Sequence, residues 1–161
     1  MNQTRTVCYI GIGSNLGDAI DNVQRALQRL AALRDTRLSG KSSLFRTAPL
    51  NADGDDYVNA VACIDTLLSP TELLQALQGI EQDFGRERPY PNAPRTLDLD
   101  LLLYGSQTIA TDSLTVPHPR LTQRAFVLIP LLQLDPLITI PGQGPAHQFA
   151  PAVADQAIRK I

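Results

Sequence analysis

The chain has 161 residues, of which 43% are hydrophobic and 19% are charged, and its formal net charge is −2. This balance predicts one folded domain over residues 1–161 and excludes a long disordered chain. The small net charge gives no general reason to expect binding to nucleic acid or to membranes.

Targeting and redox signals favour the cytoplasm. The start MNQTRTVCYIGIG lacks the regions of a signal peptide, and no apolar run reaches the ~20 residues that span a bilayer. Cys8 and Cys63 are too far apart for a metal-binding spacing, so we expect buried thiols in a reducing compartment. The two histidines, His118 and His147, also lack a zinc-like spacing.

The first half of the chain alternates strand-like and helix-like patterns. Residues 6–15 predict a strand, and residues 18–33 predict a helix because apolar side chains recur at helical spacing behind a capping Asp18. Two more strands are expected at 36–48, with an irregularity at its glycine, and at 57–68.

The second half opens on a strong helix signal. Ser69, Pro70 and Glu72 provide a cap, a first-turn proline and a capping-box acid, and Gly85 can end the helix. We then expect, in chain order, a proline-rich loop at 86–95, a strand at 96–104, a turn and short strand in 105–113, a proline-held connection at 116–121, a helix at 123–134 with Pro130 in its first turn or at a kink, a short strand near 138–140 and a small terminal helix.

The resulting order is strand–helix–strand–strand–helix–strand. It is typical of a ferredoxin-like α+β sandwich, a βαββαβ antiparallel sheet with its helices on one face, followed here by C-terminal additions. The stretch GIGSNLG (11–17) is not a G-x-G-x-x-G phosphate loop, because Leu16 occupies the last position. We interpret it as a tight turn between the first strand and the first helix.

Two carboxylates interrupt an otherwise apolar strand in the run APRTLDLDLLLYG. Side chains alternate along a strand, so Asp98 and Asp100 are expected on one face, with leucines on the other, separated by roughly 6.6 Å of rise. Such a pair can hold one or two Mg²⁺ ions together with substrate phosphates, although acidic pairs at this spacing are common and a strand with one solvated face is the simpler explanation.

A basic loop precedes these aspartates. Arg86, Arg88 and Arg95 bracket PYPNAP, and guanidinium groups match phosphate oxygens in bidentate fashion. The loop therefore suits a polyphosphate clamp that closes over a ligand, with a solvated charged loop as the simpler interpretation.

A pocket for a planar ligand is suggested by the strand that starts at residue 57. Tyr57 offers a stacking ring, and Asn59 offers both a donor and an acceptor to a heterocyclic amide edge. The stretch RTAPL (46–50) and the Phe126 ring are candidates for the rest of the pocket. His118, fixed between two prolines, is a candidate nucleotide contact.

Five motifs in order resemble a known family: YIGIGSNLGD, FRTAPL, YVNAV, PRTLDLDLLLYG and VPHPRLTQRAFVLIPL. Over about residues 9–136 the chain looks like the 6-hydroxymethyl-7,8-dihydropterin pyrophosphokinases of folate biosynthesis. The resemblance implies a ferredoxin-like fold and transfer of pyrophosphate from ATP to the pterin hydroxymethyl group, which yields AMP and the pterin diphosphate. We also expect a monomer with no nucleic-acid or membrane partner.

The resemblance implies roles residue by residue. Asp98 and Asp100 match the ligands of two Mg²⁺ ions, and Arg86 and Arg95 match arginines that assist phosphoryl transfer. Positions around ATP are matched by Gln78, Glu81, Arg88, Leu101, Thr115, His118 and Arg124. The pterin pocket is matched by Thr47, Leu50, Tyr57, Asn59 and Phe126, with the Tyr57 and Phe126 rings sandwiching the pterin.

Two other interpretations share parts of this pattern. A D-x-D pair can hold a metal–nucleotide-sugar complex in a glycosyltransferase, although 161 residues are few for that class. A ferredoxin-like domain can also be a ligand sensor that assembles through its sheet. Transfer from a nucleotide sugar would favour the first, and a ligand-dependent oligomer without turnover would favour the second.

Overall fold

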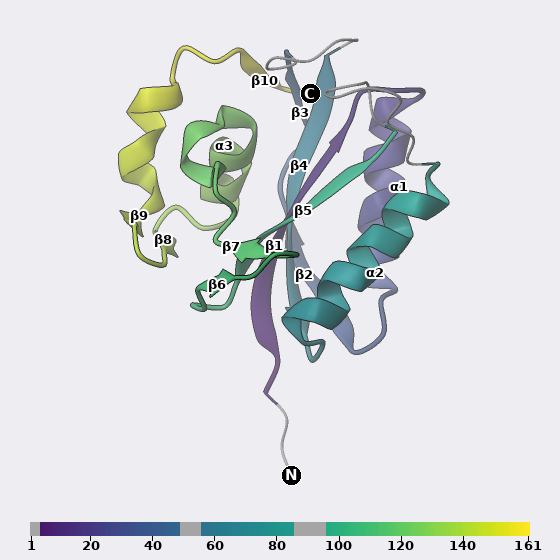
Figure 1. Cartoon of the computed structure of the whole chain (residues 1–161). Coiled ribbons are helices and arrows are strands. Elements are labelled where there is room, and N and C mark those ends of the chain that lie inside the picture. The colour runs from purple at the N-terminus through teal and green to yellow at the C-terminus, as the bar shows by residue number, and fades with distance from the viewer. Residues whose placement is uncertain (1–3, 49–55, 86–95) are drawn as a thin grey trace.

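A computed structural model describes residues 4–48, 56–85 and 96–161. Its centre is a sheet with the strand order β10–β3–β4–β1–β5, in which β2 also pairs with β4. The strands are β1 (Thr6–Ser14), β2 (Thr36–Lys41), β3 (Phe45–Thr47), β4 (Tyr57–Thr66), β5 (Asp98–Tyr104) and β10 (Ile158–Lys160). Every pairing in this sheet is antiparallel, and the order confirms the expected ferredoxin-like arrangement (Figure 1).

The strand expected at 36–48 is divided into β2 and β3, which pair with successive parts of β4. The register of β2 shifts between Leu38 and Gly40, as the glycine suggested. Ser42 lies between the two strands, where its N–H donates to Val61 O and its hydroxyl accepts from Val61 N–H. The side chain thus replaces a backbone partner of β4 at the break.

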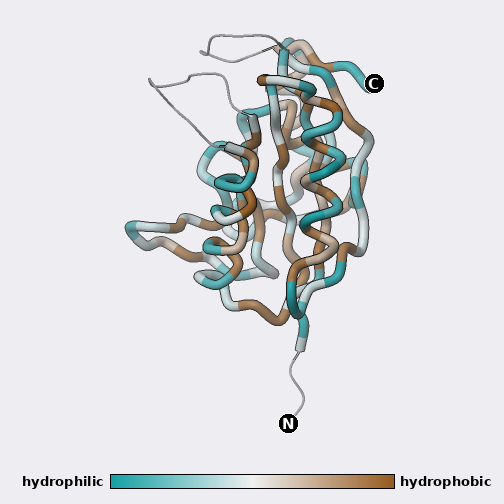
Figure 2. Tube along the Cα trace, turned by 90° about the vertical axis from the view of Figure 1, so that its right-hand side faces the viewer, coloured by the Kyte–Doolittle hydropathy of each residue, from teal (hydrophilic) through white to brown (hydrophobic). Residues whose placement is uncertain are grey.

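Two helices cover one face of the sheet, α1 (Ala19–Ala31) and α2 (Pro70–Asp83) (Figure 1). Asp18 caps α1, and Ser69 with Glu72 forms the predicted capping box of α2. Both helices are amphipathic, and Figure 2 shows hydrophilic residues recurring from turn to turn along them. Their apolar faces pack on Ile10, Ile64 and Leu99 of the sheet.

The opposite face of the sheet carries a second helical layer, which the C-terminal additions to the βαββαβ unit form. It consists of α3 (Ala125–Leu134) and the 3₁₀ segment η2 (Ala146–Val153), preceded by the short η1 (Leu121–Gln123). These elements enclose a second core with Val61 and Leu102 of the sheet. Pro130 lies within α3 and not in its first turn, so one of the two expected placements is wrong.

The C-terminal part ends differently from the expectation. Beyond two small hairpins, β6 (Ile109–Ala110) with β7 (Thr115–Val116) and β8 (Thr139–Ile140) with β9 (Gly144–Pro145), the chain returns to the main sheet. The small helix expected near the end is the 3₁₀ segment η2, and after it an unexpected strand, β10, pairs with β3. Among the described residues, no helix is both long and apolar enough to cross a membrane.

Candidate functional site

The two aspartates lie on the face of β5 that is turned toward α3. Leu99 and Leu101 are buried in the α1/α2 core, and the side chains of Asp98 and Asp100 are half-buried on the other face. The alternation ends at a register shift opposite Tyr9 and Ile10, beyond which both Leu102 and Leu103 enter the α3 core. The two carboxylates therefore lie in the regular first part of β5, before the register shift.

Helix α2 supports this strand through Glu81. Its side chain is 3% exposed, and Glu81 Oε2 accepts a hydrogen bond of 2.8 Å from the N–H of Leu99. Among the described residues, β5 is the last strand on its side of the sheet, so this N–H lies at the sheet edge. The Glu81 carboxylate therefore supplies a hydrogen-bond acceptor to the backbone N–H of Leu99, the residue between the two aspartates.

Asn22 of α1 holds the start of the same strand. Its Nδ2 lies 3.2 Å from Ser14 Oγ, 3.0 Å from Leu16 O and 3.4 Å from Thr96 O. Asn22 is buried, and it connects the β1–α1 turn to Thr96, two residues before β5. This turn includes Gly17 at φ 73°, which confirms the turn interpretation of the GIGSNLG stretch.

The register of the sheet places Asp98, Gly13 and Asn59 in one row across three strands. Asp98 lies opposite Gly13 of β1, and Gly13 in turn lies opposite Asn59 of β4. One strand therefore separates the carboxylates from Asn59, or about 10 Å at the usual strand spacing. Because Gly13 has no side chain, the floor between them is formed by the backbone of β1.

Thr47 and Tyr57 lie beside Asn59 at the β4 end of this row. Thr47 of β3 pairs with Tyr57, and Asn59 Nδ2 donates to Thr47 Oγ1 at 2.6 Å. Thr47 and Asn59 are buried, whereas Tyr57 is half-buried. The structure thus brings together three of the five residues predicted for the planar ligand.

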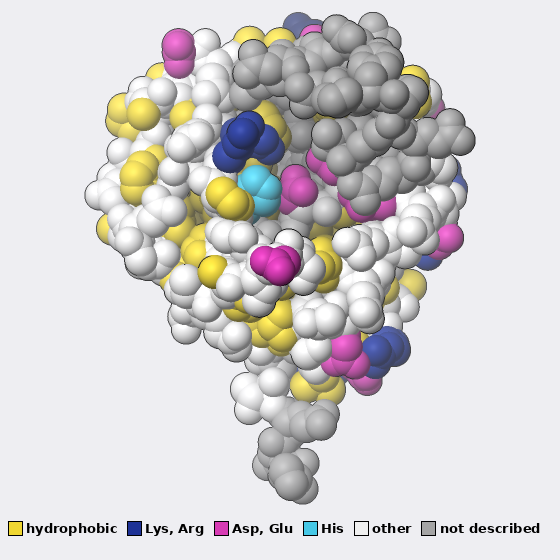
Figure 3. Space-filling model, viewed as in Figure 1, with side chains coloured by type: hydrophobic (Ala, Val, Ile, Leu, Met, Phe, Trp, Pro, Cys, Tyr) yellow, Lys and Arg dark blue, Asp and Glu magenta, His cyan; other side chains and the backbone are white. Residues whose placement is uncertain are grey.

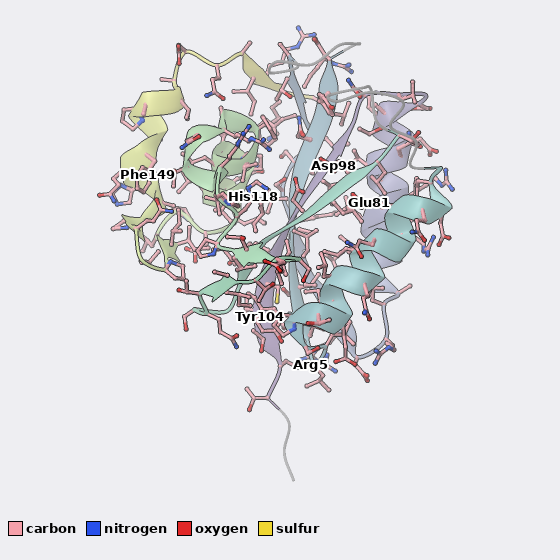
Figure 4. All side chains as sticks on the ribbon, viewed as in Figure 1. Arg5, Glu81, Asp98, Tyr104, His118 and Phe149 are labelled. Atoms are coloured by element: carbon pink, nitrogen blue, oxygen red, sulfur yellow. The ribbon has the colours of Figure 1, made fainter. Side chains whose placement is uncertain are left out.

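His118 approaches the aspartates from the connection after β7. Figure 4 shows Asp98 with His118 on one side and Glu81 of α2 on the other. The backbone N–H of His118 donates to Leu102 O, and the ring Nδ1 accepts a hydrogen bond from the backbone N–H of Arg120 at 3.2 Å. Burial lowers the pKa of His118, and the Arg124 charge lowers it further while Asp98 opposes both. The neutral ring therefore presents Nε2–H as a donor.

Arg124, at the N-terminus of α3, joins the nucleotide and pterin candidates. Its guanidinium carbon lies 5.4 Å from the centre of the Phe126 ring, within cation–π range. Phe126 is half-buried against the α3 core. Figure 3 shows a histidine, a basic side chain and acidic side chains gathered on this face. The site thus combines positive and negative groups in one area.

Other predicted site residues have different surroundings. Leu101 is 4% exposed in the α1/α2 core, so only its backbone remains for a ligand. Gln78 is exposed on α2 one turn before Glu81, and Thr115 is exposed on β7. Leu50, Arg86, Arg88 and Arg95 lie outside the described residues, as does the loop predicted at 86–95.

The donor set fits Mg²⁺. Asp98 and Asp100 offer only oxygen atoms, and Mg²⁺ is usually held by one or two carboxylates that share it with substrate phosphates. Within residues 4–48, 56–85 and 96–161, no group of three or more His, Cys, Asp or Glu side chains is arranged to hold a metal ion.

Comparison with known proteins decides the family. Residues 9–136 match the model of the 7,8-dihydro-6-hydroxymethylpterin-pyrophosphokinase family. The chain belongs to this family. It is therefore a pyrophosphokinase of folate biosynthesis, a transferase that uses ATP and passes pyrophosphate to the hydroxymethyl group of 6-hydroxymethyl-7,8-dihydropterin. This assignment overrules the glycosyltransferase and sensor interpretations.

Curated relatives agree along almost the whole chain. A 2-amino-4-hydroxy-6-hydroxymethyldihydropteridine pyrophosphokinase from Pseudomonas aeruginosa is 46% identical over 154 residues, which cover 95% of each chain. The enzyme of the same name from Haemophilus influenzae is 40% identical and covers 95% of this chain and 96% of its own. These values confirm the family resemblance that the motifs carried.

Solved structures support the fold. The Plasmodium falciparum HPPK-DHPS with pteroate superimposes at a TM-score of 0.77 with 11% identity. Another HPPK-DHPS in complex with substrates gives a TM-score of 0.74 with 12% identity. The present chain spans 45% and 43% of those two longer chains, so the match concerns one part of each.

Sequence reasoning missed two structural contributions to the site. The bond from Glu81 to the backbone of Leu99 joins residues that are distant in the chain, and only the helix register along α2 hints at a buried acid there. The role of Gly13 also depends on strand register, since glycine spacing alone suggested only a turn.

Proposed function

We propose that Asp98 and Asp100 hold two Mg²⁺ ions for the pyrophosphoryl transfer of this enzyme. The observation that carries the proposal is their shared face on β5, one strand away from Asn59 across a backbone floor. Because one strand separates these carboxylates from the pterin pocket, metal ions held by them can contact the phosphates of ATP while the pterin is bound next to ATP. When bound, Mg²⁺ neutralises phosphate charge.

The acceptor side of the site is the pterin pocket. We assign to it Thr47, Leu50, Tyr57, Asn59 and Phe126. The amide of Asn59, oriented by its bond to Thr47, recognises the heterocyclic amide edge. The rings of Tyr57 and Phe126 stack on the two faces of the pterin, which excludes water from the hydroxymethyl oxygen.

The donor side binds ATP. Arg124 and the neutral His118 contact the nucleotide, with a guanidinium for phosphate oxygens and Nε2–H for a neutral acceptor. The positions completing this side are Gln78, Glu81, Arg88, Leu101 and Thr115. Glu81 is best explained as acting through β5, because its carboxylate is bonded to Leu99.

The reaction depends more on the alignment of the hydroxymethyl oxygen with the β-phosphorus of ATP than on side chains that act as acids or bases. The hydroxymethyl oxygen bonds to the β-phosphorus and its proton passes to solvent, as the bond from that phosphorus to the bridging α-phosphate oxygen breaks and AMP leaves with that oxygen. Arg86 and Arg95 are proposed to stabilise the charge on the transferred phosphates, by several kcal/mol at most for one guanidinium. The strands β4 and β5 keep acceptor and donor in fixed relation.

A product assay tests the proposal. Protein, ATP, Mg²⁺ and 6-hydroxymethyl-7,8-dihydropterin are followed by ³¹P NMR for wild type, Asp98→Asn, Asp100→Asn and the exposed control Asp112→Asn. We expect pterin-dependent AMP and pterin diphosphate from wild type and control, and a loss of turnover by orders of magnitude in the two β5 variants. Normal rates in both β5 variants would refute the metal assignment.

We also propose that residues 1–161 act as one pyrophosphokinase domain and as a monomer in the cytoplasm. Free Cys8 and Cys63 are compatible with a reducing compartment. Sedimentation equilibrium tests the monomer: a mass near 17.5 kDa supports it, and a concentration-independent multiple of that mass overturns it.

A further inference from the structure

Gly13 of β1 lies against the two pocket residues of β4. A methyl group added at Gly13 would lie 2.9 Å from Asn59 Oδ1 and 3.6 Å from Tyr57 Cδ1. The first distance is shorter than carbon–oxygen contacts found in proteins, whereas the second is an ordinary contact. The absence of a side chain at Gly13 therefore leaves the space in which the Asn59 amide oxygen lies.

Asn59 has little freedom to move away from such a methyl group. Its Nδ2 donates to Thr47 Oγ1 at 2.6 Å, and the side chain is 4% exposed. Turning the amide away from β1 would break this bond or carry the group toward its packed neighbours. A clash at Gly13 therefore changes the amide orientation that a pterin would meet.

We propose that Gly13 is a positioning residue of the pterin pocket: only glycine at this point of β1 lets Asn59 keep its bond to Thr47 with Oδ1 turned toward the pocket floor. The inference rests on the proposed function, because it takes Asn59 as a pterin contact. It extends the site to a strand to which neither motif spacing nor family resemblance assigned a pterin role. Alanine at residue 13 is expected to act on the acceptor and not on the nucleotide.

Gly11, on the same strand and face, provides a matched control. It lies opposite Asp100 and Val61, and a methyl group there would be 3.5 Å from the Leu102 side chain, an ordinary contact. Both substitutions introduce alanine within β1, so they share the general effect of the residue on the strand. They differ in whether the methyl group meets Asn59.

The experiment is calorimetry with 6-hydroxymethyl-7,8-dihydropterin on protein saturated with Mg²⁺ and α,β-methylene-ATP. We expect Gly13→Ala to raise the pterin Kd about tenfold or more, as for loss of one oriented hydrogen bond in a buried pocket. The Kd of Gly13→Ala for the nucleotide analogue alone is expected to change less than about twofold. In Gly11→Ala, the Kd for the pterin and the Kd for the nucleotide analogue should each change less than about twofold. Wild-type pterin affinity in Gly13→Ala, with Asn59→Ala impaired, would overturn the inference.

A double variant separates the clash from general damage to the strand. In Asn59→Ala the oxygen that the methyl group would meet is gone, so adding Gly13→Ala should cost less than about twofold in pterin Kd. If Gly13→Ala alone does not fold, the double variant should fold again, and its failure to do so would overturn the inference. An unchanged pterin Kd in Asn59→Ala would instead refute the proposed pocket and the inference with it.

Discussion

The buried carboxylate of Glu81 accepts a hydrogen bond from the N–H of Leu99, 2.8 Å away, at the peptide group that joins Asp98 to Leu99. The helix α2 is thereby connected to the free edge of the sheet between the two proposed metal ligands. The family resemblance placed Glu81 near ATP, whereas this contact indicates that its carboxylate fixes the backbone that carries the carboxylates.

Glu81→Ala should destabilise the fold and impair turnover together. The unsatisfied Leu99 N–H costs about 1–3 kcal/mol in free energy of unfolding, and β5 loses its support beside Asp98. Glu81→Gln retains an acceptor oxygen, so it should recover most of both quantities. Urea denaturation and steady-state kinetics measure the two effects. A Glu81→Ala variant with raised ATP KM, normal kcat and normal stability would favour direct ATP binding.

Phe126→Leu should weaken both ligands. It removes the ring proposed to stack on the pterin. It also removes the ring that Arg124 lies over, an interaction worth about 0.5–1 kcal/mol at a partly exposed position. Calorimetry with each ligand should show weaker pterin binding and a smaller loss for the nucleotide analogue. Phe126→Tyr retains a ring and should behave like wild type.

A second arginine–aromatic pair supplies the control for this effect. The guanidinium carbon of Arg25 on α1 lies 4.7 Å from the centre of the Phe84 ring, on the α1/α2 side of the sheet. Arg25→Gln should leave both ligand affinities unchanged, whereas Arg124→Gln should weaken the nucleotide analogue. Equal ligand affinities in the Arg124 and Arg25 variants would contradict a role for Arg124 in nucleotide binding.

The capping box of α2 predicts a pH-dependent contribution to stability. The hydrogen bond from the Ser69 backbone N–H lowers the pKa of Glu72 below the usual 4.5, and the hydrogen bond from Arg34 makes the second-largest contribution in the same direction. A lowered folded-state pKa means that the stabilisation is present above the unfolded pKa and is lost as the pH falls through the folded pKa. The stability difference between wild type and Glu72→Gln should therefore shrink below about pH 4.5. Denaturation curves across that range test it; a constant difference would contradict the cap assignment.

Cys8 should resist modification in the native protein. Burial raises the pKa of its thiol to about 12, and the side chain is fully buried between β4 and β5 on β1. Cys63 is partly exposed on β4. Maleimide labelling at about pH 8, followed by peptide mass spectrometry, should modify Cys63 first. Equal labelling rates in folded protein would show that β1 opens far more readily than its packing implies.

Local signals predicted local structure well. The Ser69–Glu72 cap and the Asp18 cap were predictable because each depends on residues within one helical turn. The shared face of Asp98 and Asp100 followed from strand alternation, and the family motifs supplied candidate roles. The roles of Arg86 and Arg95 stay predictions, since both residues lie outside the described part of the chain.

Contacts between distant segments were not predictable from single-strand patterns. The β10 strand has only three residues, and its pairing with β3 depends on how α3 and η2 return the chain to the sheet. The contact of Gly13 with Asn59 depends on the register of β1 against β4, which no residue of either strand encodes alone. Pattern analysis found both residues without finding their relationship.

Metal titration tests the central claim most directly. Mn²⁺, as a substitute for Mg²⁺, would be titrated by electron paramagnetic resonance into protein with α,β-methylene-ATP, with nucleotide alone as the blank. The proposed site predicts two protein-dependent Mn²⁺ ions per wild-type chain and their loss in the Asp98→Asn/Asp100→Asn double variant, at unchanged thermal stability. The same stoichiometry and affinity in the double variant would contradict the claim that these two carboxylates hold the metal.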